Sequence, residues 1–216
     1  DLMVSSDEGT LSMHKASTTP KDPVKGVIDS LALAAEESQQ SLSDYLARGE
    51  LLVHGTTHAI NAIVTSSTAR TAFLTTAGHP DTLVIREGGR MEPFNFTVAY
   101  PEPYIPRELT FEISERIAVD GSIKTALDEV ATRRVLEALK ASDIEAIGVC
   151  FLWSVVNPVH EERVGALIEE ILPGIPYTLS HKINPSIREY RRAISTCIDA
   201  SLKPIMGAYM QIGRAH

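Results

Sequence analysis

Strand-like and helix-like spacings of apolar residues alternate along this 216-residue chain. Near its start, Leu2–Ser6 and Thr10–Ala16 alternate apolar and polar positions. The intervening Asp7-Glu8-Gly9 has the composition of a tight turn, because glycine tolerates positive φ. From Val24 to Leu33 the apolar residues keep helical spacing, behind an Asp22 that can cap the first turn. The pattern predicts a β-hairpin followed by a helix.

Two short apolar runs come next, Leu51–Val53 and Thr71–Thr75, and the apolar residues of His58–Val64 between them have helical spacing. We predict buried strands for the two runs and a helix between them, which is β-α-β order. The tract that follows, Arg86–Arg107, is polar, rich in proline and long for a simple connection. We therefore expect a functional or interface loop.

The second half of the chain shows the same alternation more regularly. Leu109–Ile117 and Ser122–Thr125 flank a glycine-containing turn and predict a second hairpin, and the apolar stripe of Asp128–Lys140 predicts a helix. The run Ala146–Trp153 is short, partly β-branched and bounded by polar residues. These features favour a buried parallel strand.

Three more elements complete the pattern. A helix extends from Pro158 to the breaker Pro173-Gly174, a strand covers Tyr177–Ile183, and a last helix covers Ile187–Leu202. Helices that separate short buried strands are typical of an α/β sheet, so α/β is the predicted fold class.

Composition and charge narrow the class of protein. With 44% apolar residues, 22% charged residues and a net charge of −8, the chain is globular and repels polyphosphate backbones and acidic membranes. We therefore expect neither nucleic acid nor a membrane as partner. Cys150 and Cys197 lack CxxC spacing, which predicts buried free thiols of a reducing compartment. Without a basic leader or an apolar run near ~20 residues, we expect a cytoplasmic location.

The sharpest polar cluster is His54–Ala62, at the point where a predicted strand gives way to a helix. The hydroxyls of Thr56 and Thr57, with exposed amides at the helix start, could hold a phosphate or a substrate carboxylate. In the alternative interpretation, Thr57 only caps the helix and Gly55 only permits the turn. A metal bound by the two histidines is a third option, disfavoured because the Gly-Thr-Thr segment breaks the helix between them.

Three further polar clusters could carry chemistry, and the first of them could line the same crevice. The hydroxyls of Thr75–Asp81 follow a predicted strand, although turn and cap chemistry explains them equally well. Arg86 and Arg90 suit a carboxylate or phosphate, or belong to a solvated loop. Arg188 and Arg192 share one helical face and could clamp an anion, or take part in a surface network of ion pairs.

Six segments, in the right order, resemble motifs of the hydantoinase A/5-oxoprolinase family. They are Lys15–Pro20 (K-x-x-STP), His54–Ala62 (HGTT-x-x-x-NA), Thr75–Asp81 (TT-x-GF-x-D, with His79 where Phe is usual), Glu115–Gly121 (ER-x-x-x-DG), Asn157–Glu161 (NP-x-HE) and Arg188–Tyr190 (REY). Each motif is short, but together they identify the chain as a member of this family.

The resemblance implies an actin/Hsp70/sugar-kinase-like ATPase fold. It implies an enzyme that uses ATP and Mg²⁺ to phosphorylate and open a cyclic amide such as a hydantoin or 5-oxoproline, together with a B-type hydantoinase subunit or domain. Related carboxylases use the same kind of subunit to activate acetone or acetophenone, so a ketone carboxylase subunit is the alternative. A non-catalytic, ATPase-like interaction module is another, and the proline-rich Tyr100–Arg107 would suit its surface.

The same resemblance assigns the candidate residues. Those expected near the reaction centre are His54, Thr56, Thr57 and Asn61; those expected to bind substrate or phosphate are Asp1, Gly55, Thr75, Thr76 and Arg90. Asp1 aligns with the last residue of a GGTFTD-like phosphate loop. We therefore expect residues 1–211 to be a partial N-terminal domain that lacks its first strand and phosphate loop. Ile212–His216 match one reading frame of a common sequencing adapter, and we interpret them as a possible non-native tail.

Overall fold

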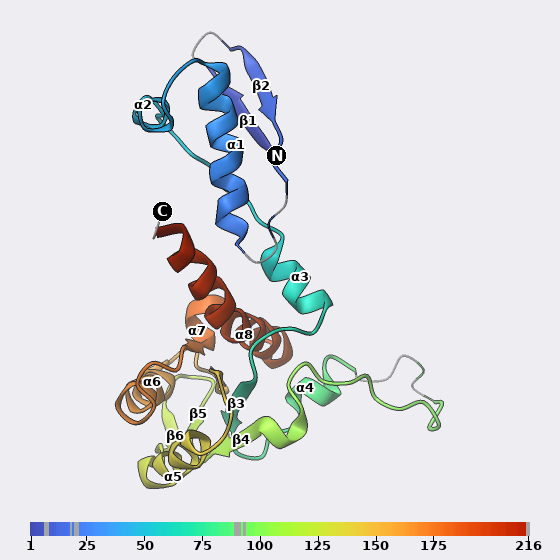
Figure 1. Ribbon diagram of the computed structural model, residues 1–216. Coiled ribbons are helices and arrows are strands. Elements are labelled where there is room, and N and C mark those ends of the chain that lie inside the picture. The colour runs from blue at the N-terminus through green and yellow to red at the C-terminus, as the bar shows by residue number, and fades with distance from the viewer. Residues whose placement is uncertain (7–8, 18, 20–21, 89–91, 93, 215–216) are drawn as a thin grey trace. The chain divides into compact units, whose positions relative to one another are not determined.

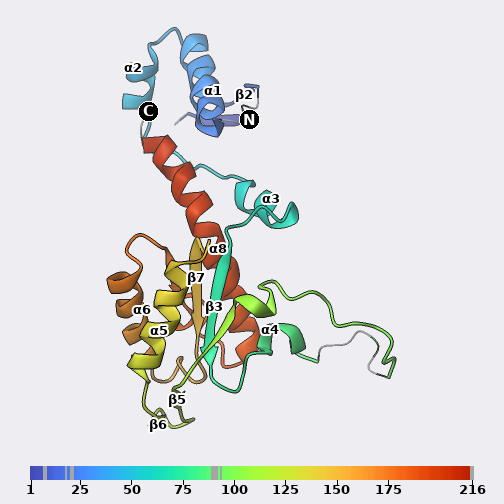
Figure 2. The ribbon, with the colours of Figure 1, turned by 60° about the horizontal axis from the view of Figure 1, so that its bottom comes forward.

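The computed structural model describes residues 1–6, 9–17, 19, 22–88, 92 and 94–214 (Figure 1; Figure 2). The chain divides into two units. Unit 1 comprises Asp1–His58 and Met206–His216, and unit 2 comprises Ala59–Ile205. The long helix α8 (Glu189–Arg214) passes from one unit into the other, and the boundary lies just after Pro204, which is inside this helix. A proline there removes one backbone hydrogen bond from the helix.

Unit 1 contains the predicted hairpin and helix. Its elements are β1 (Leu2–Ser5), β2 (Leu11–His14), α1 (Pro23–Glu37), α2 (Leu42–Ala47) and the first residue of α3 (His58–Val64). The strands pair antiparallel, with Leu2 opposite His14, and both contact α1. The side chain of Asp22 accepts a hydrogen bond from the amide of Lys25, 3.2 Å away, so the predicted cap is confirmed.

The predicted buried strand Leu51–Val53 is wrong. This segment has no regular secondary structure, and its three side chains are 84%, 61% and 82% exposed. An apolar run becomes a buried strand only if a neighbouring strand and a covering layer receive it, and the described residues supply neither. The helix predicted after it, α3 (His58–Val64), is confirmed with the same bounds.

Unit 2 is the α/β part of the chain. Its elements are β3 (Thr71–Thr76), α4 (Thr82–Ile85), the 3₁₀ helix η1 (Arg107–Leu109), β4 (Thr110–Ile113), β5 (Arg116–Ile117), β6 (Ile123–Thr125), α5 (Glu129–Lys140), β7 (Ala146–Cys150), α6 (Val159–Ile171), β8 (Tyr177–Leu179), α7 (Ser180–Ile183) and most of α8. Among the described residues, one sheet has the order β4-β3-β7-β8, and every neighbouring pair is parallel. The predicted fold class and central strands are confirmed.

Helices cover both faces of this sheet (Figure 2). Ala72 and Leu74 of β3 pack in one buried cluster with residues of α5 and α6, whereas Phe73, which points to the other face, packs with Ala193 and Cys197 of α8. All residues of β3 and β7 are therefore buried. This explains why both strands are continuous apolar or small-residue runs rather than alternating ones.

Four predicted elements in this half are right in kind and wrong in extent. The strand predicted over Ala146–Trp153 ends at Cys150, just before a turn. The segment Leu109–Ile117 divides, because β4 joins the large sheet and only β5 pairs with β6. The strand predicted over Tyr177–Ile183 ends at Leu179, where the short helix α7 begins. The last helix starts at Glu189 and continues to Arg214 instead of ending at Leu202, since the helix tolerates Pro204.

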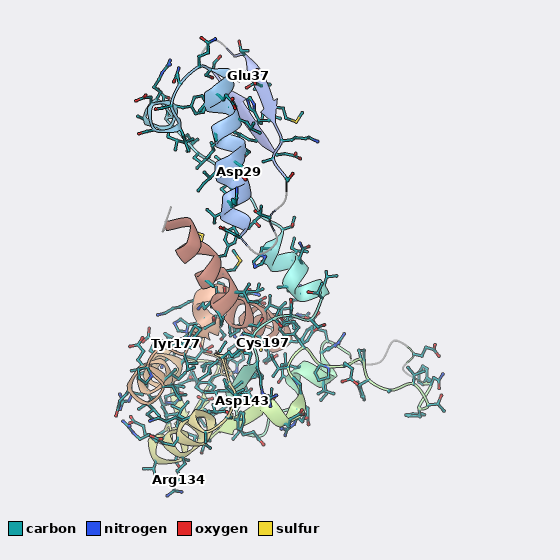
Figure 3. The ribbon with its side chains drawn as sticks, viewed as in Figure 1. Asp29, Glu37, Arg134, Asp143, Tyr177 and Cys197 are labelled. Carbon is teal, nitrogen blue, oxygen red and sulfur yellow. The ribbon has the colours of Figure 1, made fainter. Side chains whose placement is uncertain are left out.

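Two buried thiols lie where α8 packs on the sheet. Cys150 ends β7 and Cys197 lies on α8 (Figure 3), and both are free and buried, as predicted. Burial raises the pKa of the Cys150 thiol to about 12 and the pKa of Cys197 well above its ordinary value. Both thiols are therefore held neutral and unreactive in the folded chain.

We expect the two thiols to make the chain less stable at alkaline pH. Their pKa values are higher folded than unfolded, so their stabilising contribution is complete below pH 9 and is lost at higher pH, for Cys150 as the pH rises towards about 12. The free energy of unfolding should fall by about 1.4 kcal/mol per thiol for each pH unit in this window. Urea unfolding at pH 7.5 and 10 measures the fall. The Cys150→Ala/Cys197→Ala variant should lose less stability than the wild type; equal losses would contradict the assignment.

Candidate functional site

The segment His54–Thr57 is an exposed, irregular stretch of unit 1 that leads into α3. The hydroxyl of Thr56 accepts a hydrogen bond from the amide of His58, 3.1 Å away, at the start of this helix. Thr56 thus closes a turn directly before the first residue of the helix. The segment does not follow a buried strand, so the argument that placed it at the carboxyl end of one does not hold.

A tyrosine that the sequence did not single out organises this segment. Tyr209, near the end of α8, is buried, and its hydroxyl is hydrogen-bonded to Nε2 of His54. Its ring also stacks with His54 and with His58, the first residue of α3, at centroid distances of 5.9 Å and 5.5 Å. The signal for Tyr209 was the helical spacing beyond Leu202, where we predicted the helix to end.

The other candidate residues lie in different places. Asp1 is exposed in unit 1, where its carboxylate lies 3.7 Å from Nζ of Lys15. Asn61 is an exposed residue of α3 in unit 2, so it belongs to a different unit from His54–Thr57. Arg90 falls outside the described residues.

Thr75 and Thr76 end the central strand β3, and both are buried. The hydroxyl of Thr76 donates to the carboxylate of Glu115 and accepts from the amide of Leu152 at 3.0 Å. The other oxygen of Glu115 lies 2.8 Å from Nδ1 of His160. Thr76 is therefore engaged inside the protein, where it joins the ends of β3 and β7, and does not line a crevice.

A second buried network surrounds Glu161, whose side chain is fully buried. Its carboxylate accepts hydrogen bonds from the amide of Phe151 at 2.9 Å, the hydroxyl of Ser180 at 2.5 Å, and the amide of His181 at 3.2 Å. It also lies 2.6 Å from Nδ1 of that histidine. These partners follow β7 and β8, so one carboxylate joins the ends of two strands. The helical turn α7 after Leu179 brings the Ser180 and His181 donors to it.

Arg192 completes this network from α8. It is buried, and its guanidinium donates to the hydroxyl of Ser180 at 3.1 Å and to the carbonyls of Phe151 at 2.9 Å and Ser186 at 2.5 Å. The predicted anion clamp of Arg188 with Arg192 is therefore wrong. An arginine with its donors already satisfied inside the protein is not available to a ligand.

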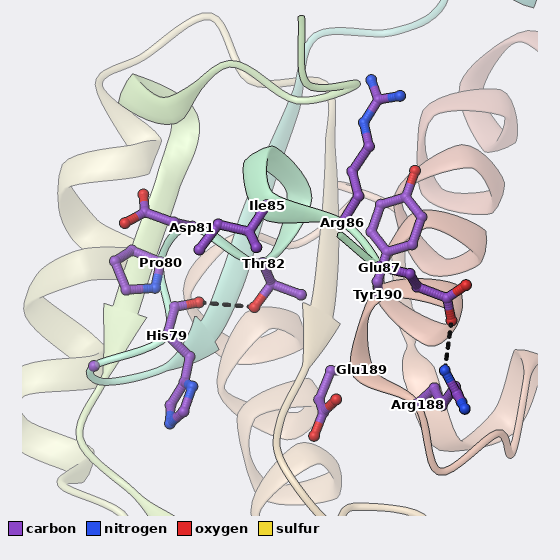
Figure 4. A pocket seen from close by; sticks show the side chains of 11 residues that line it. His79, Pro80, Asp81, Thr82, Ile85, Arg86, Glu87, Arg188, Glu189 and Tyr190 are labelled. Atoms are coloured by element: carbon purple, nitrogen blue, oxygen red, sulfur yellow. Dashed lines mark hydrogen bonds and ion pairs between the residues drawn. The ribbon is translucent and has the colours of Figure 1, made fainter. Parts of the chain in front are cut away.

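A hollow of unit 2 lies beyond the carboxyl end of β3 and has a volume of about 610 Å³ (Figure 4). It is lined by Gly78–Thr82, by Ile85–Glu87 and by Arg188–Tyr190. Three of the four polar clusters predicted from the sequence contribute to it. The turn that enters it needs glycine, because Gly78 has a φ of +84°. The carboxyl ends of parallel strands are the usual place for ligand sites.

Ion pairs neutralise Asp81 and Glu87, two of the three acids that line this pocket. Asp81 accepts from Nε of Arg107 at 3.0 Å, and Glu87 accepts two hydrogen bonds from Arg191, at 2.8 and 3.0 Å. Arg191 thereby holds the pKa of the Glu87 carboxyl below its usual value. Arg188 lies 3.8 Å from the same carboxylate, and this ion pair joins two sides of the pocket (Figure 4).

Arg86 has hydrogen-bonding capacity to spare. Its Nη2 donates to the carbonyl of Glu102 at 2.9 Å, but its Nε is buried and meets no acceptor among the residues that the structure describes. The residue also has a φ of +58°, which is unfavourable for a side chain of this kind. A buried donor of this kind gains from a ligand that brings an oxygen acceptor.

The described residues contain no ready-made metal site. The part of the chain that the structure describes contains no group of three or more His, Cys, Asp or Glu side chains placed to hold a metal ion. Nor does any helix in that part have the length and apolarity needed to cross a membrane.

Comparison with known proteins connects this geometry to a family. Residues 1–172 match the family model of the hydantoinase/oxoprolinase N-terminal region. Caprolactamase subunit alpha of Pseudomonas jessenii is 32% identical over 213 residues, covering 98% of this chain and 31% of the relative. The acetophenone carboxylase gamma subunit of Aromatoleum aromaticum is 32% identical over 212 residues, covering 92% and 29%. The 5-oxoprolinase of Saccharomyces cerevisiae is 30% identical over 184 residues, covering 72% and 14%.

The fold agrees with these relatives. The crystal structure of the ATP-dependent caprolactamase from Pseudomonas jessenii superposes with a TM-score of 0.84 at 31% identity, covering 98% of this chain and 32% of that chain. This chain thus spans about a third of the length of that protein.

We expect the Glu161 network to be essential for folding. Glu161→Gln places an amide N–H₂ among hydrogen-bond donors, so it should cost about 3 kcal/mol of unfolding free energy. Its neighbour Glu162, with a side chain 56% exposed, offers a matched control, and Glu162→Gln should change stability by less than about 0.5 kcal/mol. Urea unfolding of the two variants compares them. Equal stability would show that the buried carboxylate is dispensable.

Proposed function

Because the chain belongs to the hydantoinase/oxoprolinase family, we propose that it forms part of an ATP-dependent enzyme that opens a cyclic amide. Residues 1–211 are part of its N-terminal domain, with an actin/Hsp70/sugar-kinase-like ATPase fold. The substrate is a lactam or imide ring of the hydantoin or 5-oxoproline kind. Support comes from relatives named caprolactamase and 5-oxoprolinase.

The chemistry explains why ATP would be needed. A cyclic amide without ring strain resists hydrolysis because amide resonance stabilises its carbonyl. ATP supplies a phosphoryl group for the carbonyl oxygen, which removes that resonance and makes ring opening favourable. Phosphoryl transfer requires positioned donors and an electrostatic cradle rather than a covalent protein nucleophile.

The pocket beyond β3 is the proposed binding site for the polar end of the substrate. The observation that carries this proposal is that Gly78–Thr82, Ile85–Glu87 and Arg188–Tyr190, far apart in sequence, line one hollow of about 610 Å³. Asp81 and Glu87 are paired with arginines, while Nε of Arg86 faces no acceptor among the described residues. A carbonyl or carboxylate oxygen of the substrate would satisfy that donor.

The remaining candidate residues are assigned to catalysis, to binding or to the shape of the site. We assign His54, Thr56, Thr57 and Asn61 to the reaction centre, and Asp1, Gly55 and Arg90 to phosphate or substrate binding. Thr75 and Thr76, both buried, would act by shaping the end of β3 rather than by direct contact.

The proposal includes Mg²⁺ only as the ion that accompanies ATP. Mg²⁺ in such sites is held by one or two carboxylates and by the phosphates themselves. In the described part of the chain, the pocket acids Asp81 and Glu87 are occupied by arginines, so they do not fit a direct metal ligand role. The proposal assigns no metal ligand to this chain.

The partner and the cellular location are part of the same proposal. A B-type hydantoinase subunit or domain would complete the enzyme, which would act in the cytoplasm. The relatives are themselves named as alpha and gamma subunits.

A second candidate function is the ATP-dependent carboxylation of a ketone. The acetophenone carboxylase gamma subunit favours it, because its identity to this chain equals that of the caprolactamase subunit. A non-catalytic interaction module is the third. The coding sequence upstream of Asp1 distinguishes the interaction module from the two enzymes. A Gly-Gly-Thr motif directly before Asp1 would support an enzyme.

We expect the complete gene product, with its B-type subunit, to hydrolyse ATP in response to one substrate class. The screen compares hydantoins, 5-oxoproline and larger lactams with acetone or acetophenone plus bicarbonate. Arg188→Ala should lower kcat/KM by about 10- to 100-fold, because it removes one charge-assisted hydrogen bond from the pocket to the substrate. Arg134→Ala removes an exposed arginine of α5 and should have no effect.

Two outcomes would be decisive. If no compound stimulates ATP turnover, the catalytic proposal fails. If turnover is stimulated but Arg188→Ala behaves like Arg134→Ala, the enzyme stands and the pocket is not its substrate site.

A further inference from the structure

Tyr209 joins the two ends of the segment His54–His58. It follows His54 by 155 positions in the sequence, and all three residues belong to unit 1. The plane of its ring is tilted by only 12° from the imidazole of His54 and by 24° from that of His58. The centroid distances given above lie in the usual range for offset-stacked rings. One aromatic ring therefore contacts both ends of the segment.

The hydroxyl of Tyr209 adds a directional contact to the first of these histidines. It is hydrogen-bonded to Nε2 of His54, and Tyr209 itself is only 7% exposed. His54 lies on an exposed segment without regular secondary structure, where an imidazole would ordinarily rotate between rotamers. Here the stack fixes the plane of the ring, and the hydroxyl fixes which nitrogen faces Tyr209. His54 is therefore held in one orientation.

This orientation matters because the two nitrogens of a neutral imidazole have different roles. One carries the proton and donates a hydrogen bond, whereas the other accepts one. A tyrosine hydroxyl that donates to Nε2 leaves the ring proton on Nδ1. Nδ1 then becomes the donor that the histidine can offer to a ligand.

The segment that carries His54 has donors and no acid. Its residues are His-Gly-Thr-Thr-His, and the hydroxyl of Thr56 fixes the turn by accepting from the amide of His58 at 3.1 Å. A Cβ added at Gly55 would meet no described atom within 4 Å, so the backbone there is open to an approaching group. A set of donors without a carboxylate suits an oxyanion rather than a cation.

We propose that Tyr209 is the positioning residue for His54: its hydroxyl donates to Nε2, so that Nδ1 of His54 donates to an oxygen of the phosphoryl group during its transfer. The inference rests on the proposed function, which supplies the reaction and places His54 in its reaction centre. Tyr209 acts only through His54 and does not touch the substrate. A donor that is already aimed needs no reorganisation when charge develops on the phosphoryl oxygens.

The test compares variants of the complete gene product, assembled with its B-type subunit and supplied with ATP and the substrate class that the screen identifies. Tyr209→Phe keeps both stacks and removes only the hydroxyl. It should lower kcat by about 5- to 10-fold. The KM values should not change, because the lost contact acts in the transition state. His54→Ala should lower kcat by about 100-fold or more. Single turnovers at excess enzyme keep the slowest variant measurable.

The decisive variant combines the two substitutions. In the His54→Ala background, Tyr209→Phe should change the rate by less than about 2-fold, because the hydroxyl has no histidine left to orient. If Tyr209 only stabilised the fold, its substitution would lower the rate by the same factor in both backgrounds. Tyr45→Phe is the matched control, since Tyr45 on α2 is the other tyrosine of unit 1. It should leave kcat unchanged.

Five results would overturn the inference while turnover by the wild type leaves the proposed reaction standing. These are an equal loss from Tyr209→Phe in both backgrounds, an unchanged kcat in Tyr209→Phe, an unchanged kcat in His54→Ala, a rise in KM with kcat unchanged, or an equal loss in Tyr45→Phe. Absence of turnover by the wild type with every substrate class is a different outcome. It would refute the proposed function and the role of Tyr209 with it.

Discussion

The buried carboxylate of Glu161 is the interaction on which the carboxyl edge of the unit 2 sheet depends. It receives donors from the segments that follow β7 and β8, and Arg192 closes the network from α8. A buried charge of this kind is tolerable only when every oxygen has partners, and losing one partner is costly. The network therefore fixes the ends of two strands and the start of one helix relative to one another.

The pocket depends on this network, because the network holds the segments that line it. The amide of Arg192 donates to the carbonyl of Arg188, so the buried guanidinium of Arg192 also fixes the residues one turn earlier, which line the hollow. On the other side, Thr76 is held by Glu115, and the chain then turns at Gly78 into the pocket. The motif residues that the sequence suggested as ligands therefore form two groups. Thr76 and Arg192 are buried and hold the strand ends in place, whereas others, such as Arg188, line the pocket.

Much of the fold could be predicted, and the failures have a common cause. The apolar runs of β3 and β7 and the stripes of α5 and α6 were sufficient, because burial on both faces of a parallel sheet leaves a strong pattern. Leu51–Val53 has the same pattern without the burial, since a strand also needs a neighbour to pair with. Arg192 and Thr76 were misplaced because polar residue type does not say whether its partners are protein groups or a ligand.

The sequence by itself determined the family, the α/β class, the two buried thiols and the clusters from which a site could be built. Periodicity and short motifs depend on residues that are close together in the sequence. They can therefore be recognised without knowing which residues meet in the folded chain. Only the tertiary structure decided which clusters meet: Gly78–Thr82, Arg86 and Arg188 in one pocket, Glu161 with Arg192 inside the protein, and Tyr209 against His54. Those choices depend on contacts between residues far apart in the chain, where burial and hydrogen-bond geometry decide which polar groups remain open to a ligand.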